Sequence, residues 1–186
     1  QQGGYATAVE RYNRFLADYP GHRSAGMAVV HRGLARWRVA VEGTADDARV
    51  LEIAKSVLPE ITAQPEFATA KADLSVLLPD LAERLAKQAA VPGGADAAAA
   101  DVALVQAVEA RKLIDKYVGT SDAAASRLPP IDSLIAAAER RRTRQERLAA
   151  TIAEIRRAAA SRDLDEAAKA RATLVVEFPD AAGAPE

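Results

Sequence analysis

Large apolar residues recur every three or four positions through most of this chain, and that spacing restricts what it can fold into. The clearest case is the segment 5–19, in which one helical face carries Tyr5, Val9, Tyr12, Phe15, Leu16 and Tyr19. Alanine, the strongest helix former, makes up roughly a quarter of the chain. The runs of β-branched and aromatic residues that are typical of strands are missing. The sequence therefore predicts an all-α fold.

We expect about seven helices, separated by Pro, Gly and capping residues. Their predicted ranges are 5–19, 24–41, 45–61, 66–91, 96–118, 131–161 and 163–178. The segment 44–47 looks like an N-cap with acidic residues in the first turn, and Asp163 is followed three residues later by Glu166. Pro79 lacks an amide proton, so we expect it to kink or split the helix 66–91.

The clearest linker is Pro92-Gly93-Gly94, which divides the chain into halves of similar size. The 186 residues suffice for one ordinary domain or for two small lobes. We therefore predict an N-terminal helical lobe at 1–91 and a C-terminal helical lobe at 92–186, hinged near this linker. The chain lacks an initiator Met, and we interpret it as a segment of a longer protein.

The composition argues against several classes of function. The chain has no Cys and a formal net charge of −1, so disulfides, thiolate metal sites and a global attraction to nucleic acid or anionic membranes are not expected. No apolar run approaches the roughly 20 residues that span a bilayer. His22 and His31 lack the spacing of two ligands on one helix face, and we expect both to be loop or surface residues. We predict no metal, no cofactor and no enzymatic activity.

Residues 4–20 and 163–179 resemble each other. The first segment follows the pattern Gly-Tyr-x-x-Ala-x-x-x-Tyr-x-x-Phe-Leu-x-x-Tyr-Pro. In the second, the matching positions are Leu164, Ala167, Leu174 and Phe178-Pro179, and the exception is Arg171, which stands opposite Tyr12. This alignment predicts that Phe15 and Leu174 face the core and that Ala substitution of either would cost about 3 kcal/mol.

This pattern resembles the first helix of a tetratricopeptide repeat, in the form common in bacterial envelope and scaffold proteins. The resemblance is good over residues 4–42, fair over 163–186 and poor between them, where the usual 34-residue period is not kept. It implies antiparallel helical hairpins stacked as a short, irregular α-solenoid with a protein-binding role. In such a pair, Ala8, Ala28, Gly33 and Ala35 would supply the small contacts. A compact helical bundle is the alternative.

An arginine-rich stretch interrupts the apolar stripe of the long helix predicted at 131–161. Between residues 138 and 162 there are eight Arg and three Glu, a local excess of five positive charges. The functional interpretation is a basic surface for an acidic partner segment, and its candidate residues are Arg140, Arg141, Arg142, Arg144 and Arg147. The alternative is a solvated face whose arginines pair with Glu139 and Glu146.

These observations favour a non-catalytic protein-interaction or scaffold module whose partner is a protein with an acidic or extended segment. The first alternative is a structural spacer that holds flanking domains apart. The second is a binder of nucleic acid or anionic lipid; nucleic acid is disfavoured because this helix has no aromatic residue on which a base could stack. The sequence leaves open the compartment, the oligomeric state and the identity of the partner.

Overall fold

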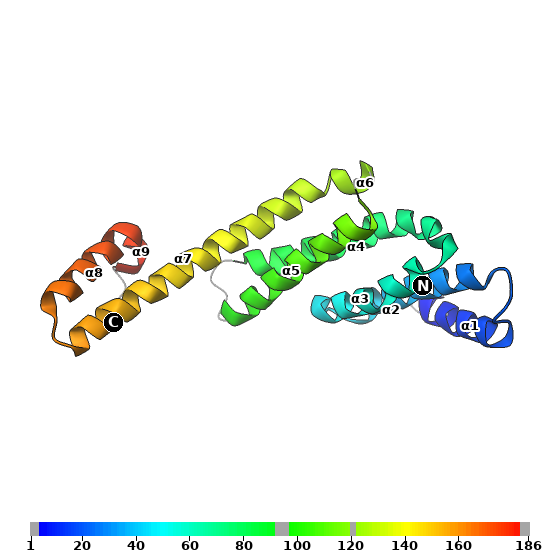
Figure 1. Cartoon of the computed structure of the whole chain (residues 1–186), viewed down its shortest axis with the longest axis horizontal. Coiled ribbons are helices and arrows are strands. Elements are labelled where there is room, and N and C mark those ends of the chain that lie inside the picture. Colours follow the sequence, from blue (N-terminus) through cyan, green and yellow to red (C-terminus); the bar gives the residue numbers. More distant parts are fainter. Residues whose placement is uncertain (1–3, 92–96, 120–121, 183–186) are drawn as a thin grey trace. The chain divides into compact units, whose positions relative to one another are not determined.

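A computed structural model describes residues 4–91, 97–119 and 122–182 of the chain (Figure 1). No β-strand occurs in these ranges, and the predicted all-α class is confirmed. The elements in chain order are α1 (Gly4–Asp18), α2 (Ala25–Gly43), α3 (Asp47–Thr62), the 3₁₀ helix η1 (Pro65–Ala70), α4 (Lys71–Ala90), α5 (Ala97–Tyr117), α6 (Asp122–Ala125), α7 (Leu128–Ala160), α8 (Leu164–Glu177) and α9 (Pro179–Ala182).

Two compact units make up the chain, and the border between them lies within α7. Unit 1 comprises residues 1–136 and unit 2 comprises residues 137–186. Within unit 1, α4 and α5 pack against each other side by side (Figure 1). The predicted linker at 92–94 lies outside the described residues, but it joins these two packed neighbours. The predicted border between lobes is therefore not the border of the compact units.

Two predicted helix starts are confirmed by their hydrogen bonds. The Asp46 carboxylate accepts hydrogen bonds from the amides of Ala48 (3.0 Å) and Arg49 (3.3 Å) at the start of α3. At the start of α8, the Asp163 carboxylate accepts one from the amide of Glu166 at 3.0 Å. Each carboxylate satisfies amides that have no partner within the first helical turn.

The predicted split at Pro79 is wrong, because α4 runs from Lys71 to Ala90 without a break. Proline in a helix interior costs about 3 kcal/mol through the lost hydrogen bond and the clash with the preceding turn. Leu78 and Leu81, on either side of it, are fully buried, and their burial opposes that cost. The first residues of the predicted helix 66–91 instead form η1.

In unit 1, α2 lies between α1 and α3. Toward α1, the ring of His31 stacks on Tyr12 with ring centroids 6.0 Å apart. Toward α3, a Cβ atom added to Gly33 would lie 3.0 Å from Cγ1 of Val57 and still closer to Cγ2 of Ile61. Gly33 thus permits a close approach of two helices, as predicted for a small residue, but its neighbour is α3 rather than the hairpin partner α1.

The predicted inward positions of the repeat are less buried than expected. Helix α1 contains no buried residue, Phe15 is half-buried, and Tyr19 is 58% exposed. Leu174 is also half-buried, and Leu164 is 77% exposed. A fully buried position is required for the predicted loss of about 3 kcal/mol, so that prediction does not fit either residue. The largest fully buried side chains include Trp37, Leu51, Leu58, Ile61, Leu74, Leu78, Leu81, Leu85, Ile114 and Ile131.

In unit 2, α8 turns back along the last part of α7 (Figure 1). The turn has the hydrogen bonds of a Schellman motif: the Asp163 amide donates to Ala158 O (3.0 Å) and the Arg162 amide donates to Ala159 O (3.1 Å). Arg162 occupies the left-handed position of this motif with φ of 58°. A side chain at such a position costs about 1 kcal/mol, and glycine is the residue usually found there.

We therefore expect Arg162→Gly to stabilise unit 2 by about 0.5–1 kcal/mol, because glycine adopts the left-handed conformation without strain. Thermal unfolding followed by circular dichroism at 222 nm would measure the change. Arg156→Gly, at an exposed position inside α7, is the control and is expected to destabilise by about 1 kcal/mol. A loss of stability in Arg162→Gly would contradict the prediction.

Candidate functional site

A hollow of about 350 Å³ in unit 2 contains part of the predicted arginine site. Its lining comprises Arg141, Arg144, Gln145 and Leu148 of α7, together with Phe178, Asp180 and Ala181. The α7 residues follow the spacing i, i+3, i+4 and i+7, which places them on one helical face over about 10 Å. Leu148, Phe178 and Ala181 are apolar, so guanidinium groups and apolar surface meet in one depression.

Arg144 makes two contacts with the segment that follows α8. Its Nη2 atom lies 3.2 Å from Oδ2 of Asp180, and its Cζ atom lies 5.9 Å from the centroid of the Phe178 ring. The side chains of Arg144 and Asp180 are 57% and 86% exposed, whereas Phe178 is 3% exposed. The guanidinium is thus placed over a fixed ring and paired with a carboxylate that water also reaches.

The other three candidate arginines lie outside the hollow. Arg140 and Arg147, seven residues apart, are exposed on a neighbouring face of α7, and neither forms an ion pair with another described residue. The Nε atom of Arg142 donates to Oε1 of Glu146 at 2.8 Å on a further face. The structure therefore brings Arg141 and Arg144 together in the hollow and distributes the others around α7.

The sequence did not predict that Phe178 and Asp180 would lie beside the arginines of α7. Phe178-Pro179 follows the end of α8 as predicted, but a further short helix, α9, begins at Pro179 and brings Asp180 to Arg144. The sequence did contain a signal for α9: Pro179 followed by the acidic Asp180 is a pattern typical of the first turn of a helix.

The α7 side of the hollow is strongly positive, whereas α8 and α9 carry Asp180 and several other carboxylates. Most arginines between residues 138 and 162 are exposed, and the local excess is five positive charges. Such an excess on one helix attracts anionic groups over about 10 Å at moderate salt. The alternative, a solvated face without a ligand, predicted that the arginines pair with Glu139 and Glu146. The ion pair between Arg142 and Glu146 agrees with that part of it. The hollow is what distinguishes this surface from an ordinary charged helix.

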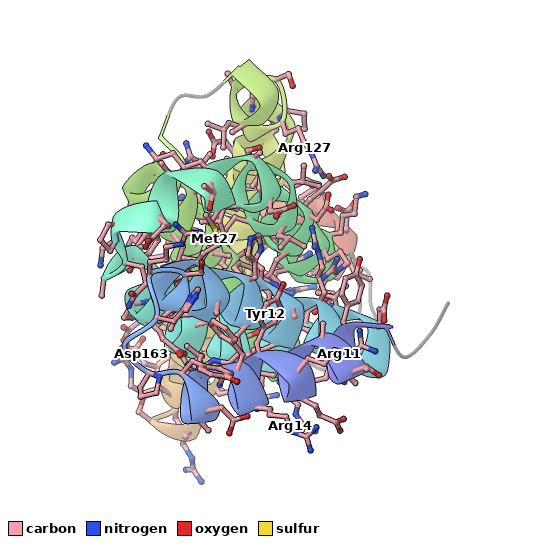
Figure 2. All side chains as sticks on the ribbon, turned by 90° about the vertical axis from the view of Figure 1, so that its right-hand side faces the viewer. Arg11, Tyr12, Arg14, Met27, Arg127 and Asp163 are labelled. Carbon is pink, nitrogen blue, oxygen red and sulfur yellow. The ribbon has the colours of Figure 1, made fainter. Side chains whose placement is uncertain are left out.

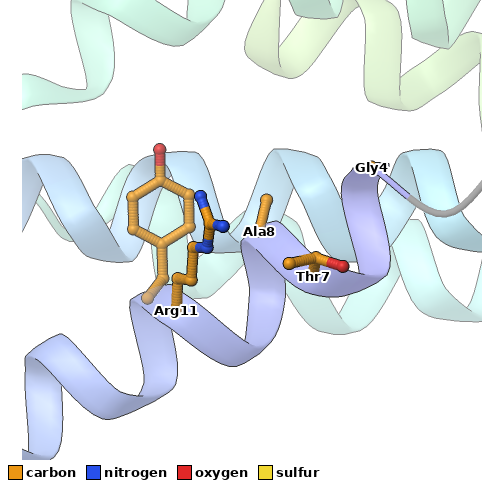
Figure 3. Close-up of a pocket in the computed structure, with 5 residues that line it drawn as sticks. Gly4, Thr7, Ala8 and Arg11 are labelled. Carbon is orange, nitrogen blue, oxygen red and sulfur yellow. The ribbon is translucent and has the colours of Figure 1, made fainter. Parts of the chain in front are cut away.

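Two further hollows lie along α1 in unit 1. One, of about 330 Å³, is lined mainly by apolar side chains of α1 and α2, among them Tyr12, Phe15 and Met27. Tyr12 and Met27 are labelled in Figure 2. The other, of about 540 Å³, has a lining that, among the described residues, belongs to α1, and Arg11 stands at one end of a row that includes Thr7 and Ala8 (Figure 3). Arg11 is the one Lys or Arg among the described residues that line these two hollows, so the paired guanidinium groups of the unit 2 hollow are not found there.

Both histidines lie at the surface, as predicted. The His22 ring meets Phe15 edge-on with centroids 5.4 Å apart, and its Nδ1 accepts a hydrogen bond from the Ser24 amide at 3.1 Å. Both His22 and His31 are exposed. Within 4–91, 97–119 and 122–182, no group of three or more His, Asp or Glu residues is arranged to hold a metal ion.

Two networks of ionised groups connect helices within unit 1. Asp47 is buried, and its carboxylate accepts hydrogen bonds from Nε of Arg84 (2.7 Å) and Nε2 of Gln88 (2.8 Å), which joins α3 to α4. Arg127, before α7, pairs with Asp80 and Glu83 of α4. Hydrogen bonds from Lys87 and Arg127 hold the pKa of Glu83 below its usual value. Every carboxylate here has a basic partner, as is typical of a structural network.

Comparisons with models of protein families, with curated proteins and with solved structures find no significant match. Among the helices that the structure describes, none combines the length and the apolar character required to cross a bilayer. The functional argument therefore rests on the geometry and charge of the hollow in unit 2.

Proposed function

We propose that this chain is a non-catalytic protein-interaction module, and that the arginine-rich face of α7 binds an acidic or extended segment of a partner protein. The observation that carries the proposal is the hollow in which Arg141 and Arg144 stand beside apolar surface. A flexible acidic segment would place carboxylates at the guanidinium groups and an apolar side chain against Leu148. The resemblance to tetratricopeptide repeats supports the same role.

A protein segment fits this site better than the alternatives. Nucleic acid binding would be aided by exposed aromatic rings near the arginines, and the only ring at the hollow, Phe178, is buried. A spacer without a ligand requires no positive helix beside an apolar depression. Anionic lipid would be attracted by the same arginines, so the binding experiment below also includes anionic vesicles.

The test measures binding of a labelled acidic peptide by fluorescence anisotropy. The test variant changes Arg140, Arg141, Arg142 and Arg144 to Glu, and we expect it to weaken binding by about thirtyfold or more, because four attractions become repulsions. The matched control changes four exposed arginines of unit 1, Arg11, Arg14, Arg23 and Arg49, to Glu. It has the same net charge and is expected to bind within about threefold of the parent.

Parallel titrations use a 20-base-pair DNA duplex and vesicles that contain phosphatidylserine. Circular dichroism of each variant establishes that its helices are intact. Equal losses in the test and control variants would refute a specific site, because bulk charge would then govern binding. Tight binding of the duplex or the vesicles, with none of the peptide, would overturn the proposal in favour of that ligand. Absence of binding to every probe would favour the spacer.

A further inference from the structure

The carboxylate of Asp180 occupies the position in which a partner's carboxylate would meet Arg144. It lies 3.2 Å from Nη2 of Arg144 and lines the same hollow as Arg141. Both side chains are largely exposed, and an ion pair of this kind contributes little to stability. Water and competing anions therefore have access to this pair.

Resting on the proposed function, we propose that Asp180 is an internal competitor for the acidic partner, and that the partner segment carries a carboxylate within two residues of an apolar side chain. The chain itself shows the recognition chemistry. The Phe178 ring lies under the guanidinium of Arg144, and Asp180 pairs with that guanidinium two residues later. An aromatic side chain and a nearby carboxylate thus engage one arginine.

The dimensions of the hollow define the spacing in the partner. Arg141 and Leu148 are seven residues apart on one face of α7, which corresponds to about 10 Å. An extended segment advances about 3.3 Å per residue, so three or four residues span that distance. Arg144 is four residues, or about 6 Å, from Leu148, so a carboxylate at Arg144 places an apolar side chain about two residues away beside Leu148.

Asp180 is not expected to block the site completely. A guanidinium has five N–H donors, and the pairing with Asp180 at 3.2 Å leaves donors for a second carboxylate. The partner binds more weakly than it would without Asp180, because its carboxylate and that of Asp180 repel each other at Arg144. Phe178 remains buried while the partner binds, because it supports the guanidinium and forms part of the hollow.

The test compares Asp180→Asn with Glu177→Gln. Both variants remove one negative charge from an exposed carboxylate of similar location, but only Asp180 lines the hollow. The probe is a fluorescein-labelled, amidated peptide, Gly-Ser-Glu-Leu-Asp-Ser-Gly. Two comparison peptides replace its Leu by Ser, or its Glu and Asp by Gln and Asn. Anisotropy titrations at 50 and 500 mM salt give the dissociation constants.

We expect Asp180→Asn to bind the acidic Leu peptide about two- to fivefold more tightly than the parent, and this gain to shrink at 500 mM salt. Glu177→Gln is expected to change affinity less than 1.5-fold, roughly the effect of a distant screened charge. The Ser peptide should bind more weakly than the Leu peptide. The peptide without charge should bind most weakly and be insensitive to Asp180→Asn.

The outcomes separate the two proposals. If the parent binds the acidic peptides and the arginine reversal removes binding, but Asp180→Asn equals Glu177→Gln, the internal competitor is refuted and the proposed function stands. Equal affinity for the Leu and Ser peptides would refute the apolar element of the partner. If the parent binds none of the three peptides, both proposals fail.

Discussion

Trp37→Ala is expected to lower the free energy of unfolding of unit 1 by about 3–5 kcal/mol. Trp37 lies in α2 and is 0% exposed, so its truncation removes the largest fully buried side chain and leaves a cavity among packed helices. The rigid neighbours of such a cavity collapse only partly, which adds to the lost transfer free energy. Urea unfolding of both proteins, followed by circular dichroism at 222 nm, measures the change.

Tyr19→Ala is the control for Trp37→Ala. It also truncates an aromatic side chain in unit 1, but Tyr19 is 58% exposed, and we expect a loss below about 1 kcal/mol. Similar losses in the two variants would mean that α2 is not central to the core of unit 1.

Gly33→Ala is expected to destabilise unit 1 by about 1–3 kcal/mol, although alanine is the better helix former by about 1 kcal/mol. The added methyl group would overlap Cγ2 of Ile61 and crowd Cγ1 of Val57. Both of these side chains are fully buried, so neither has free space into which it could move. Urea unfolding followed by circular dichroism measures the loss.

Gly43→Ala is the matched control for Gly33→Ala, because Gly43 is in the same helix and a Cβ atom there meets nothing within 4 Å. We expect it to be neutral or slightly stabilising. A second check is a cycle with Ile61→Ala, which removes the overlapping methyl group. The double variant should lose less stability than the two single variants together. Additive losses would contradict a direct steric conflict.

Sequence patterns predicted the helices well because helix formation depends on local signals. Apolar spacing, Asp caps at Asp46 and Asp163, and glycines after helices are read from neighbouring residues, and most helix bounds agree within a few residues. The solenoid arrangement implied by the resemblance remains a prediction. Pro79 does not split α4, because burial of its neighbours, which is a tertiary effect, opposes its local cost.

Burial and the site were harder to predict, because both depend on which helices meet. Periodicity identified the apolar face of α1, but α1 packs mainly on one helix, so Phe15 remains half-buried. The arginine stretch was visible in sequence, whereas the pairing of Arg144 with Asp180 joins residues 36 apart. Asp47 illustrates the same limit: its place in the first turn of α3 suggested a capping role, and the structure pairs it with Arg84.

Phe178 is the sole aromatic residue of unit 2, since Trp37, all four tyrosines and the other two phenylalanines belong to unit 1. Tryptophan and tyrosine fluorescence consequently reports on unit 1 alone and does not detect binding at the hollow. In a protein that carries ¹⁹F-labelled phenylalanine, three resonances are expected, and one of them arises from the ring beneath Arg144. That single line would report on the occupancy of the hollow while the other two act as internal references.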